Sequence, residues 1–222
     1  MCGIFGSTNF KTFDTLYNSN KARGNFAHGH LFYNDKNYIV EKFYGNGTYA
    51  KIINNVHSFK YRQYGMFLGH TQSPTGSVRD FNEETTHPFV SNSWVIGHNG
   101  VLNNFKKLIN THVPGHTNMV DSSIIPVLLE KESNASDTDR TVKNVLELLS
   151  GTYALFIFNI LTKELYIARS GSTLFMSNNT PEFSSVKIGN MKTVTDNTLH
   201  KLQGNKFVQI NQLKNRSSFI TF

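Results

Sequence analysis

The sequence contains little cysteine and little proline, and charged residues are sparse. Its 222 residues include one cysteine and five prolines, and charged residues make up 17% of the chain. One cysteine excludes an internal disulfide and is typical of proteins in a reducing compartment, so the sequence predicts a cytoplasmic protein. We find no internal repeat, low-complexity tract or linker, and therefore expect one domain over residues 1–222.

Long hydrophobic runs are also absent. The longest apolar run covers residues 153–161, whereas a membrane-spanning helix needs about 20 apolar residues. No basic stretch followed by an apolar segment opens the chain, so no signal peptide is predicted. We expect no association with a membrane.

The formal net charge is +7 and the pI is near 9.4, yet the sequence has no dense basic run. The loosest grouping is Lys201, Lys206, Lys214 and Arg216 near the C-terminus. Scattered lysines favour a solvated basic face over a nucleic-acid site. A negatively charged protein partner is equally consistent with this charge.

Hydrophobic residues (38%) and aromatic residues (13%) are sufficient for a sizeable core. Strands are predicted in antiparallel runs with helices grouped between them, which favours an α+β fold over a parallel doubly wound sheet. Glycine and asparagine at positions 45–47 predict a chain reversal. We expect helices at 12–22, 102–109, 121–130 (with a boundary or kink at Pro126) and 137–150. We expect strands at 4–5, 31–33, 38–43, 66–71, 94–98, 152–160, 163–169, 173–177, 184–188 and 205–210.

The only cysteine, Cys2, directly follows the initiator methionine. Removal of Met1 would give one residue both a thiol nucleophile and an α-amino group with a pKa of about 7.7–8.0. Such an amine accepts a proton near neutral pH, so nucleophile and base form one unit. The alternative interpretation is a buried cysteine that has no catalytic role and happens to be second in the chain.

Several motifs accompany Cys2 in a fixed order, and together they resemble the class II (N-terminal nucleophile) glutamine amidotransferase domain. The resemblance covers residues 2–180. It rests on Met1-Cys2-Gly3-Ile4-Phe5-Gly6, Arg23-Gly24, Gly69-His70-Thr71-Gln72-Ser73-Pro74-Thr75, Thr86-His87-Pro88-Phe89, Gly97-His98-Asn99-Gly100, Val120-Asp121-Ser122-Ser123, Leu149-Ser150-Gly151-Thr152-Tyr153-Ala154-Leu155 and Ala168-Arg169-Ser170-Gly171-Ser172.

The resemblance implies a four-layer αββα sandwich, in which two antiparallel sheets lie between helical layers. It also implies glutamine hydrolysis, with Cys2 as nucleophile and with Asn99 and Gly100 as the donors that stabilise the oxyanion. Each preorganised donor contributes roughly 3–4 kcal/mol to such a reaction. From the residues alone, Asn99-Gly100 is equally typical of a hairpin turn.

Further positions match the substrate-binding pattern of the family. The resemblance implies that Asp121 pairs with the substrate ammonium, that Thr75 contacts its carboxylate, and that Arg23 with Gly24 holds the nucleophile loop. Asp121 also fits the N-cap of a helix, and the two roles are compatible. Gln72 departs from the family, which usually has an arginine there for the carboxylate, and Arg79 in the same loop is a candidate to supply that charge.

No cofactor or metal is implied. His70, His87 and His98 lie near predicted strand ends, and His28, His30, His112 and His116 have loose ligand spacing, but no cysteine or acidic cluster accompanies them. No glycine-rich phosphate-binding loop is present.

Three functions remain open. The first is a glutaminase that releases ammonia to a separate synthetase or transferase, for example one that modifies a nucleotide or base, because 222 residues leave no room for an acceptor domain. The second is a γ-glutamyl amide hydrolase, which the change at Gln72 motivates. The third is a catalytically silent binding or regulatory subunit.

Overall fold

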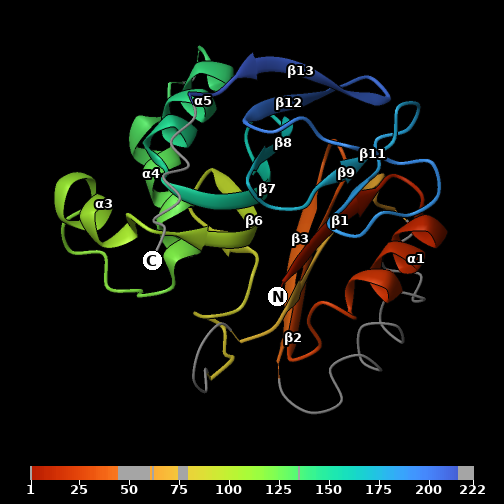
Figure 1. Ribbon diagram of the computed structural model, residues 1–222, viewed down its shortest axis with the longest axis horizontal. Coiled ribbons are helices and arrows are strands. Elements are labelled where there is room, and N and C mark those ends of the chain that lie inside the picture. The colour runs from red at the N-terminus through yellow and green to blue at the C-terminus, as the bar shows by residue number, and fades with distance from the viewer. Residues whose placement is uncertain (1, 45–60, 62, 75–79, 135, 215–222) are drawn as a thin grey trace.

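The computed structural model describes residues 2–44, 61, 63–74, 80–134 and 136–214. Within these residues the strands form two antiparallel sheets, with helices on the outer face of each (Figure 1). The predicted α+β fold with two antiparallel sheets between helical layers is therefore confirmed. The reversal predicted at 45–47 lies outside the described residues.

The first sheet carries the N-terminus, and its central strand β1 follows Cys2 directly. Helix α1 (Phe10–Asn20) covers the outer face of this sheet, and it begins two residues earlier than predicted because the Asn9 side chain accepts a hydrogen bond from the Thr12 backbone. In spatial order the strands are β11 (Lys192–Thr193), β9 (Phe175–Met176), β10 (Phe183–Ser184), β1 (Gly3–Ser7), β4 (Met66–Gln72), β2 (Ala27–Tyr33) and β3 (Tyr38–Tyr44).

The second sheet is covered by three α-helices and carries the strand with Asn99 and Gly100. Its strands, in spatial order, are β13 (Lys206–Gln212), β12 (Thr198–Gln203), β8 (Leu165–Ser170), β7 (Gly151–Asn159), β6 (Trp94–Leu102) and β5 (Phe89–Val90). The helices are α3 (Phe105–His112), α4 (Ile124–Glu132) and α5 (Thr138–Leu148), and a 3-10 turn, η2 (Asp121–Ser123), precedes α4.

Side-chain alternation along the strands explains the layers. On β1, Ile4 faces the second sheet, whereas Phe5 packs under α1. On β7, Phe156 and Phe158 face the first sheet, and Leu155 lies with the residues under α4 and α5. Because successive side chains point to opposite faces, a strand covered on both sides is apolar throughout. The largely apolar run at 153–161 therefore lies mostly within β7, an interior strand of the second sheet.

Several predicted elements differ from the structure. Strand β6 continues past His98 to Leu102, so Asn99-Gly100 lies within a strand and the hairpin interpretation is wrong. Helix α3 consequently begins at Phe105, later than predicted. Pro126 lies in the first turn of α4, where its missing N–H has no helical partner to lose, so it marks the helix start and causes no kink.

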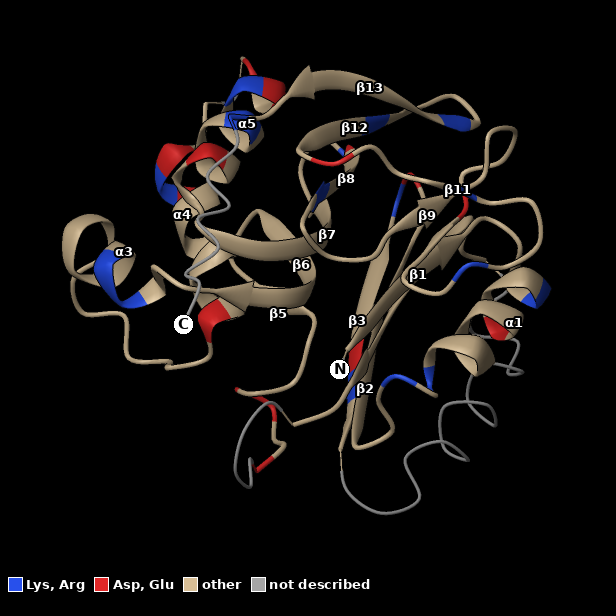
Figure 2. Ribbon diagram, viewed as in Figure 1, with Lys and Arg blue, Asp and Glu red and all other residues tan. Residues whose placement is uncertain are grey.

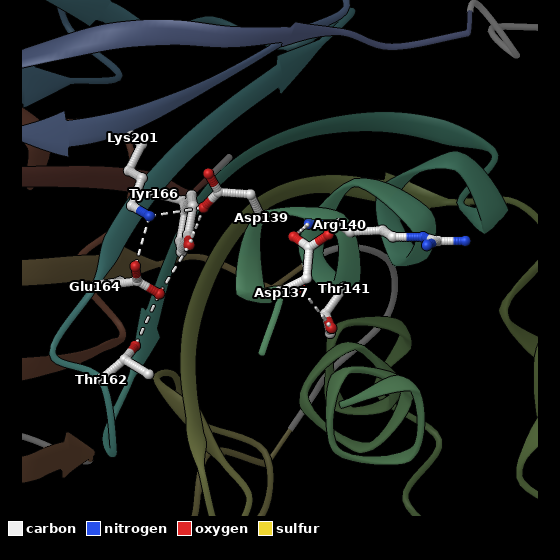
Figure 3. A network of polar contacts seen from close by, with 8 residues as sticks. All are labelled: Asp137, Asp139, Arg140, Thr141, Thr162, Glu164, Tyr166 and Lys201. Carbon is white, nitrogen blue, oxygen red and sulfur yellow. Dashed lines mark hydrogen bonds and ion pairs between the residues drawn. The ribbon is translucent and has the colours of Figure 1, made fainter. Parts of the chain in front are cut away.

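A charged network attaches α5 to the second sheet (Figure 3). Lys201 on β12 donates to Asp139 on α5 at 2.8 Å and to Glu164 beside β8 at 2.5 Å, and the Tyr166 hydroxyl donates to Asp139 at 2.6 Å. Burial opposes ionisation, but these hydrogen bonds hold the pKa values of both carboxyls below their usual range. The network fixes the helix at its N-terminal end.

Charged side chains are distributed over many elements (Figure 2). Lysines and arginines occur on α1, α3, α5, β12 and β13, with acidic residues among them on α1, α4 and α5. Within the described part of the chain, no helix is long and apolar enough to span a membrane.

Candidate active site

Cys2 lies at the entrance to β1, where contacts with two other segments fix its backbone. The Arg23 guanidinium donates from Nε to the Cys2 carbonyl at 2.7 Å, and the Ser73 hydroxyl donates to the Arg23 carbonyl at 3.1 Å. The Cys2 thiol lies 3.8 Å from the Ser73 carbonyl oxygen. Gly24 is the next residue, and a Cβ there would lie 2.5 Å from the Gln72 carbonyl carbon and 2.7 Å from the Ser73 nitrogen. Arg23 and Gly24 therefore contact Cys2 and the segment that faces it, and their role in holding the nucleophile loop remains a prediction.

The Arg23 side chain is partly withdrawn from solvent. Burial lowers the pKa of its guanidinium, and the nearby Cys2 group opposes that shift. Arg23 therefore places a partly buried cation against the backbone of Cys2.

Asn99 on β6 reaches toward β1, although the two strands belong to different sheets. Its side chain is 5% exposed, and its Nδ2 donates to the Ser185 hydroxyl at 3.2 Å. The same hydroxyl accepts from the Ile4 backbone N–H at 3.0 Å. The amide of Asn99 is therefore linked through one atom to the strand that begins beside Cys2.

Gly100 can be no other residue in this structure. A Cβ at this position would lie 2.0 Å from the Thr152 carbonyl oxygen on the neighbouring strand β7, which is far closer than any real contact. The role of Gly100 as an oxyanion donor remains a prediction.

Asp121 borders an open cavity together with Gly100. The cavity has a volume of about 380 Å³ and is lined by Gly100, Val101, Leu102, Phe105, Met119, Val120 and Asp121. One Asp121 oxygen accepts from the Leu102 backbone N–H at 2.8 Å and the other from the Ser122 backbone N–H at 2.8 Å. The position before η2 is occupied by Val120, so Asp121 is its first residue and not its N-cap.

His98, next to Asn99, is held as a neutral ring. Its Nδ1 lies 2.7 Å from the Ser122 hydroxyl and its Nε2 lies 3.4 Å from the Thr152 carbonyl. Burial lowers the pKa of His98, and the charge of Asp121 only partly opposes this shift. His70 Nε2 donates to the His98 carbonyl at 2.9 Å. These histidines bond to the backbone and to hydroxyls, and the described residues contain no group of three or more His, Cys, Asp or Glu placed to hold a metal.

Gln72 is fully buried at the end of β4. Its Nε2 donates to the Thr85 carbonyl at 3.0 Å, and its Oε1 accepts from the His87 backbone N–H at 3.2 Å. The side chain thus anchors the segment that precedes β5, a contact that the sequence did not indicate. Its predicted contact with substrate remains a prediction. The other two loop candidates, Thr75 and Arg79, lie outside the described residues.

Sequence reasoning missed Ser185. Residues 184–188 were expected to form a strand, but β10 ends at Ser184. The Ser185 backbone N–H still donates to the Ile4 carbonyl at 2.8 Å. The Ile4 N–H donates to the Ser185 hydroxyl, which takes the place of a backbone carbonyl. No spacing or composition signal distinguishes this serine from its neighbours.

The chain is similar to known proteins in sequence and in fold. No family model matches the chain. It is 30% identical over 185 residues to the glutamine–fructose-6-phosphate aminotransferase (isomerizing) of Francisella tularensis and 28% identical over 186 residues to that of Staphylococcus aureus, with 78% and 79% of this chain covered. The chain spans about 30% of the length of these relatives.

Solved structures show the same fold. An allosteric regulatory enzyme of purine biosynthesis superposes with a TM-score of 0.76 at 18% identity, covering 96% of this chain and 50% of that one. A glutamine aminotransferase class-II domain protein from Silicibacter pomeroyi superposes with a TM-score of 0.62 at 12% identity, covering 96% of this chain and 99% of that one. The chain is thus similar in sequence to one part of these glutamine-dependent aminotransferases and similar in fold to a class-II glutamine aminotransferase domain protein.

Proposed function

We propose that this protein hydrolyses the side-chain amide of glutamine, with Cys2 as the nucleophile. The observation that carries the proposal is the meeting of β1 and β6, because it brings the strand that follows Cys2 within one hydroxyl of the Asn99 amide. Glutamine also appears in the names of the similar aminotransferases. Cytoplasm is the proposed location, since the single thiol must stay reduced.

The reaction begins after Met1 is removed. The Cys2 thiol transfers its proton to the α-amino group, directly or through a water, and its sulfur attacks the amide carbon of glutamine. Negative charge on the former amide oxygen is stabilised by the Asn99 side-chain N–H and the Gly100 backbone N–H. The proton then moves to the leaving nitrogen, the C–N bond breaks, and ammonia departs from a γ-glutamyl thioester.

Water completes the cycle. The α-amino group accepts a proton from a water molecule, the resulting hydroxide attacks the thioester carbon, and the C–S bond breaks to give glutamate and the Cys2 thiol. Asp121 borders the cavity and presents a carboxylate to the substrate ammonium. A paired charge of this kind discriminates against amides that lack the amino-acid head group.

The fate of the ammonia is the second part of the proposal. We infer that it passes to an acceptor enzyme, a synthetase or transferase acting on a nucleotide, a base or another small molecule. The similarity to enzymes named as aminotransferases supports nitrogen transfer as the purpose of the hydrolysis. Affinity capture with Cys2→Ala as bait tests this. A stable partner whose product requires glutamine is expected, and full glutaminase activity with no partner contradicts the inference.

Active-site labelling tests the hydrolysis. The methionine-trimmed protein is incubated with a diazo-ketone analogue of glutamine and its intact mass is measured. We expect one adduct per chain, located on Cys2 by peptide mapping, blocked by excess glutamine and absent from Cys2→Ala. A trimmed, folded protein that takes up no adduct and releases no ammonia would show that the proposal is wrong.

A γ-glutamyl amide hydrolase is the second candidate, and the position of Gln72 favours it. Where the family carries a carboxylate-binding arginine, this side chain is buried and bonded to Thr85 and His87. A weaker hold on the α-carboxylate would widen the range of accepted amides. A panel of γ-glutamyl amides separates the candidates, because selective cleavage of glutamine rejects this one. If Cys2→Ala changes no measurable property, the protein is a silent subunit.

A further inference from the structure

We propose that Ser185 is a positioning residue that aligns the oxyanion donor Asn99 with the nucleophile strand. The inference deepens the proposed glutamine hydrolysis and rests on it. In this scheme Ser185 does not contact the substrate. It acts through the amide of Asn99.

Ser185 is buried and forms hydrogen bonds with two other segments of the chain. Ser185 is 1% exposed, and its Oγ accepts from the Ile4 N–H at 3.0 Å and from Asn99 Nδ2 at 3.2 Å. The Ser185 N–H donates to the Ile4 carbonyl at 2.8 Å. The partners lie 181 and 86 residues away in sequence. One atom therefore joins the chain end, β6 and the segment after β10.

This junction determines how Asn99 meets a substrate. A hydroxyl oxygen has two acceptor sites, and here Ile4 and Asn99 occupy both. Since one hydrogen of the Asn99 amide is bound to Ser185, the amide plane is fixed and the other hydrogen is left for the oxyanion. Because Ile4 is two residues from Cys2, its hydrogen bond to Ser185 also fixes the position of the thiol relative to the Asn99 amide.

Errors in such an alignment are costly. A displacement of about 1 Å at a reacting group lowers rates by up to about 100-fold, and loss of a whole oxyanion donor costs about 100- to 1000-fold in kcat. Substitution of Ser185 by alanine leaves Asn99 in place but unanchored. We therefore expect Ser185→Ala to lower kcat about tenfold, with KM changed less than about twofold, since the contact aligns the transition state and not the bound head group.

The adjacent residue supplies a matched control. Ser184 is also fully buried, and its Oγ accepts from Asn20 Nδ2 at 2.8 Å and from the Val186 N–H at 3.0 Å. Its alanine variant loses the same number of buried hydrogen bonds without touching Asn99 or Ile4. Ser184→Ala should thus lose comparable stability and keep its kcat.

The experiment is a steady-state glutaminase assay on the wild type, Ser185→Ala, Ser185→Thr, Ser184→Ala, Asn99→Ala and the double variant Ser185→Ala/Asn99→Ala. Unfolding midpoints are measured on the same samples. The hydroxyl of threonine should restore most of kcat. The double variant should be no slower than Asn99→Ala, because a residue that acts through Asn99 has nothing to align once that amide is absent. If Ser185→Ala fails to fold, Ser185→Cys, whose sulfur is a weak acceptor of similar shape, takes its place.

Each outcome supports or overturns the positioning role of Ser185. A selective loss of kcat in Ser185→Ala, restored by threonine and non-additive with Asn99→Ala, supports the inference. An unchanged kcat, an equal loss in Ser184→Ala, or additive losses in the double variant overturn it while glutamine hydrolysis stands. A wild-type protein that releases no ammonia and takes up no diazo-ketone overturns the proposed function, and the inference falls with it.

Discussion

Replacement of Gln72 by leucine distinguishes a structural role for this residue from a role in substrate binding. Leucine keeps most of the side-chain volume and removes both polar atoms. In the structure these atoms bind the Thr85 carbonyl and the His87 N–H. Thr85 is half-buried and His87 is 3% exposed, so at least one of these backbone groups cannot find water in the variant.

The expected loss of stability follows from these two contacts. A buried backbone group left without a partner costs about 1–3 kcal/mol, so a loss of about 1–3 kcal/mol in the free energy of unfolding is expected from the His87 N–H, and more if the Thr85 carbonyl also lacks water. The total free energy of unfolding of a folded protein is roughly 5–15 kcal/mol. Gln72→Leu should therefore fold with a clearly lowered urea midpoint, while KM for glutamine changes less than about twofold because the substrate contacts are retained.

Urea titration followed by the fluorescence of Trp94 measures the loss. Trp94 is the only tryptophan in the sequence and is 1% exposed, so its emission reports unfolding of the second sheet. The control is Gln203→Leu, since Gln203 is exposed at the end of β12. We expect no measurable change in its midpoint or its KM.

The opposite pattern would refute the structural role. If Gln72 contacts the substrate, Gln72→Leu raises KM severalfold and leaves the urea midpoint within error of the wild type. That result would mean that the side chain leaves Thr85 and His87 when glutamine binds.

Three further predictions concern stability. Gly29→Ala places a Cβ 1.9 Å from the His87 carbonyl oxygen, so its melting temperature should fall far more than that of Gly65→Ala, whose Cβ meets no atom within 4 Å. Burial lowers the pKa of His28 to about 4 from 6.5, so the unfolded chain takes up this proton first. The free energy of unfolding, measured by urea titration, should therefore fall between pH 6.5 and 4. The fall should be less steep in His28→Gln, which lacks this titrating group. Lys201→Met should lower stability at pH 7, and its difference from the wild type should shrink as the pH falls through the lowered pKa values of the Asp139 and Glu164 carboxyls, because the protonated carboxyls no longer attract the ammonium.

The sequence by itself determined the α+β class, because its predicted strands come in antiparallel runs with helices grouped between them. The four-layer arrangement followed from the resemblance to a known family. The sequence also placed Cys2, Asn99 and Asp121 among the candidates, since their motifs occur in a recognisable order. Strand β12 was missed because its two leucines, Leu199 and Leu202, lie three residues apart and face different sides of the sheet, so they give no alternating pattern. Short strands such as β5 and β11 carry too few residues for any periodicity.

Only the tertiary structure decided how the candidates meet. It showed that Asn99-Gly100 continues a strand, that Gln72 is bonded to Thr85, and that Ser185 joins Ile4 to Asn99. Each of these is a hydrogen bond or a packing contact between segments that are distant in sequence. The choice between strand and turn, or between a buried and an open amide, depends on which partner lies opposite, and local residue patterns carry no record of that partner.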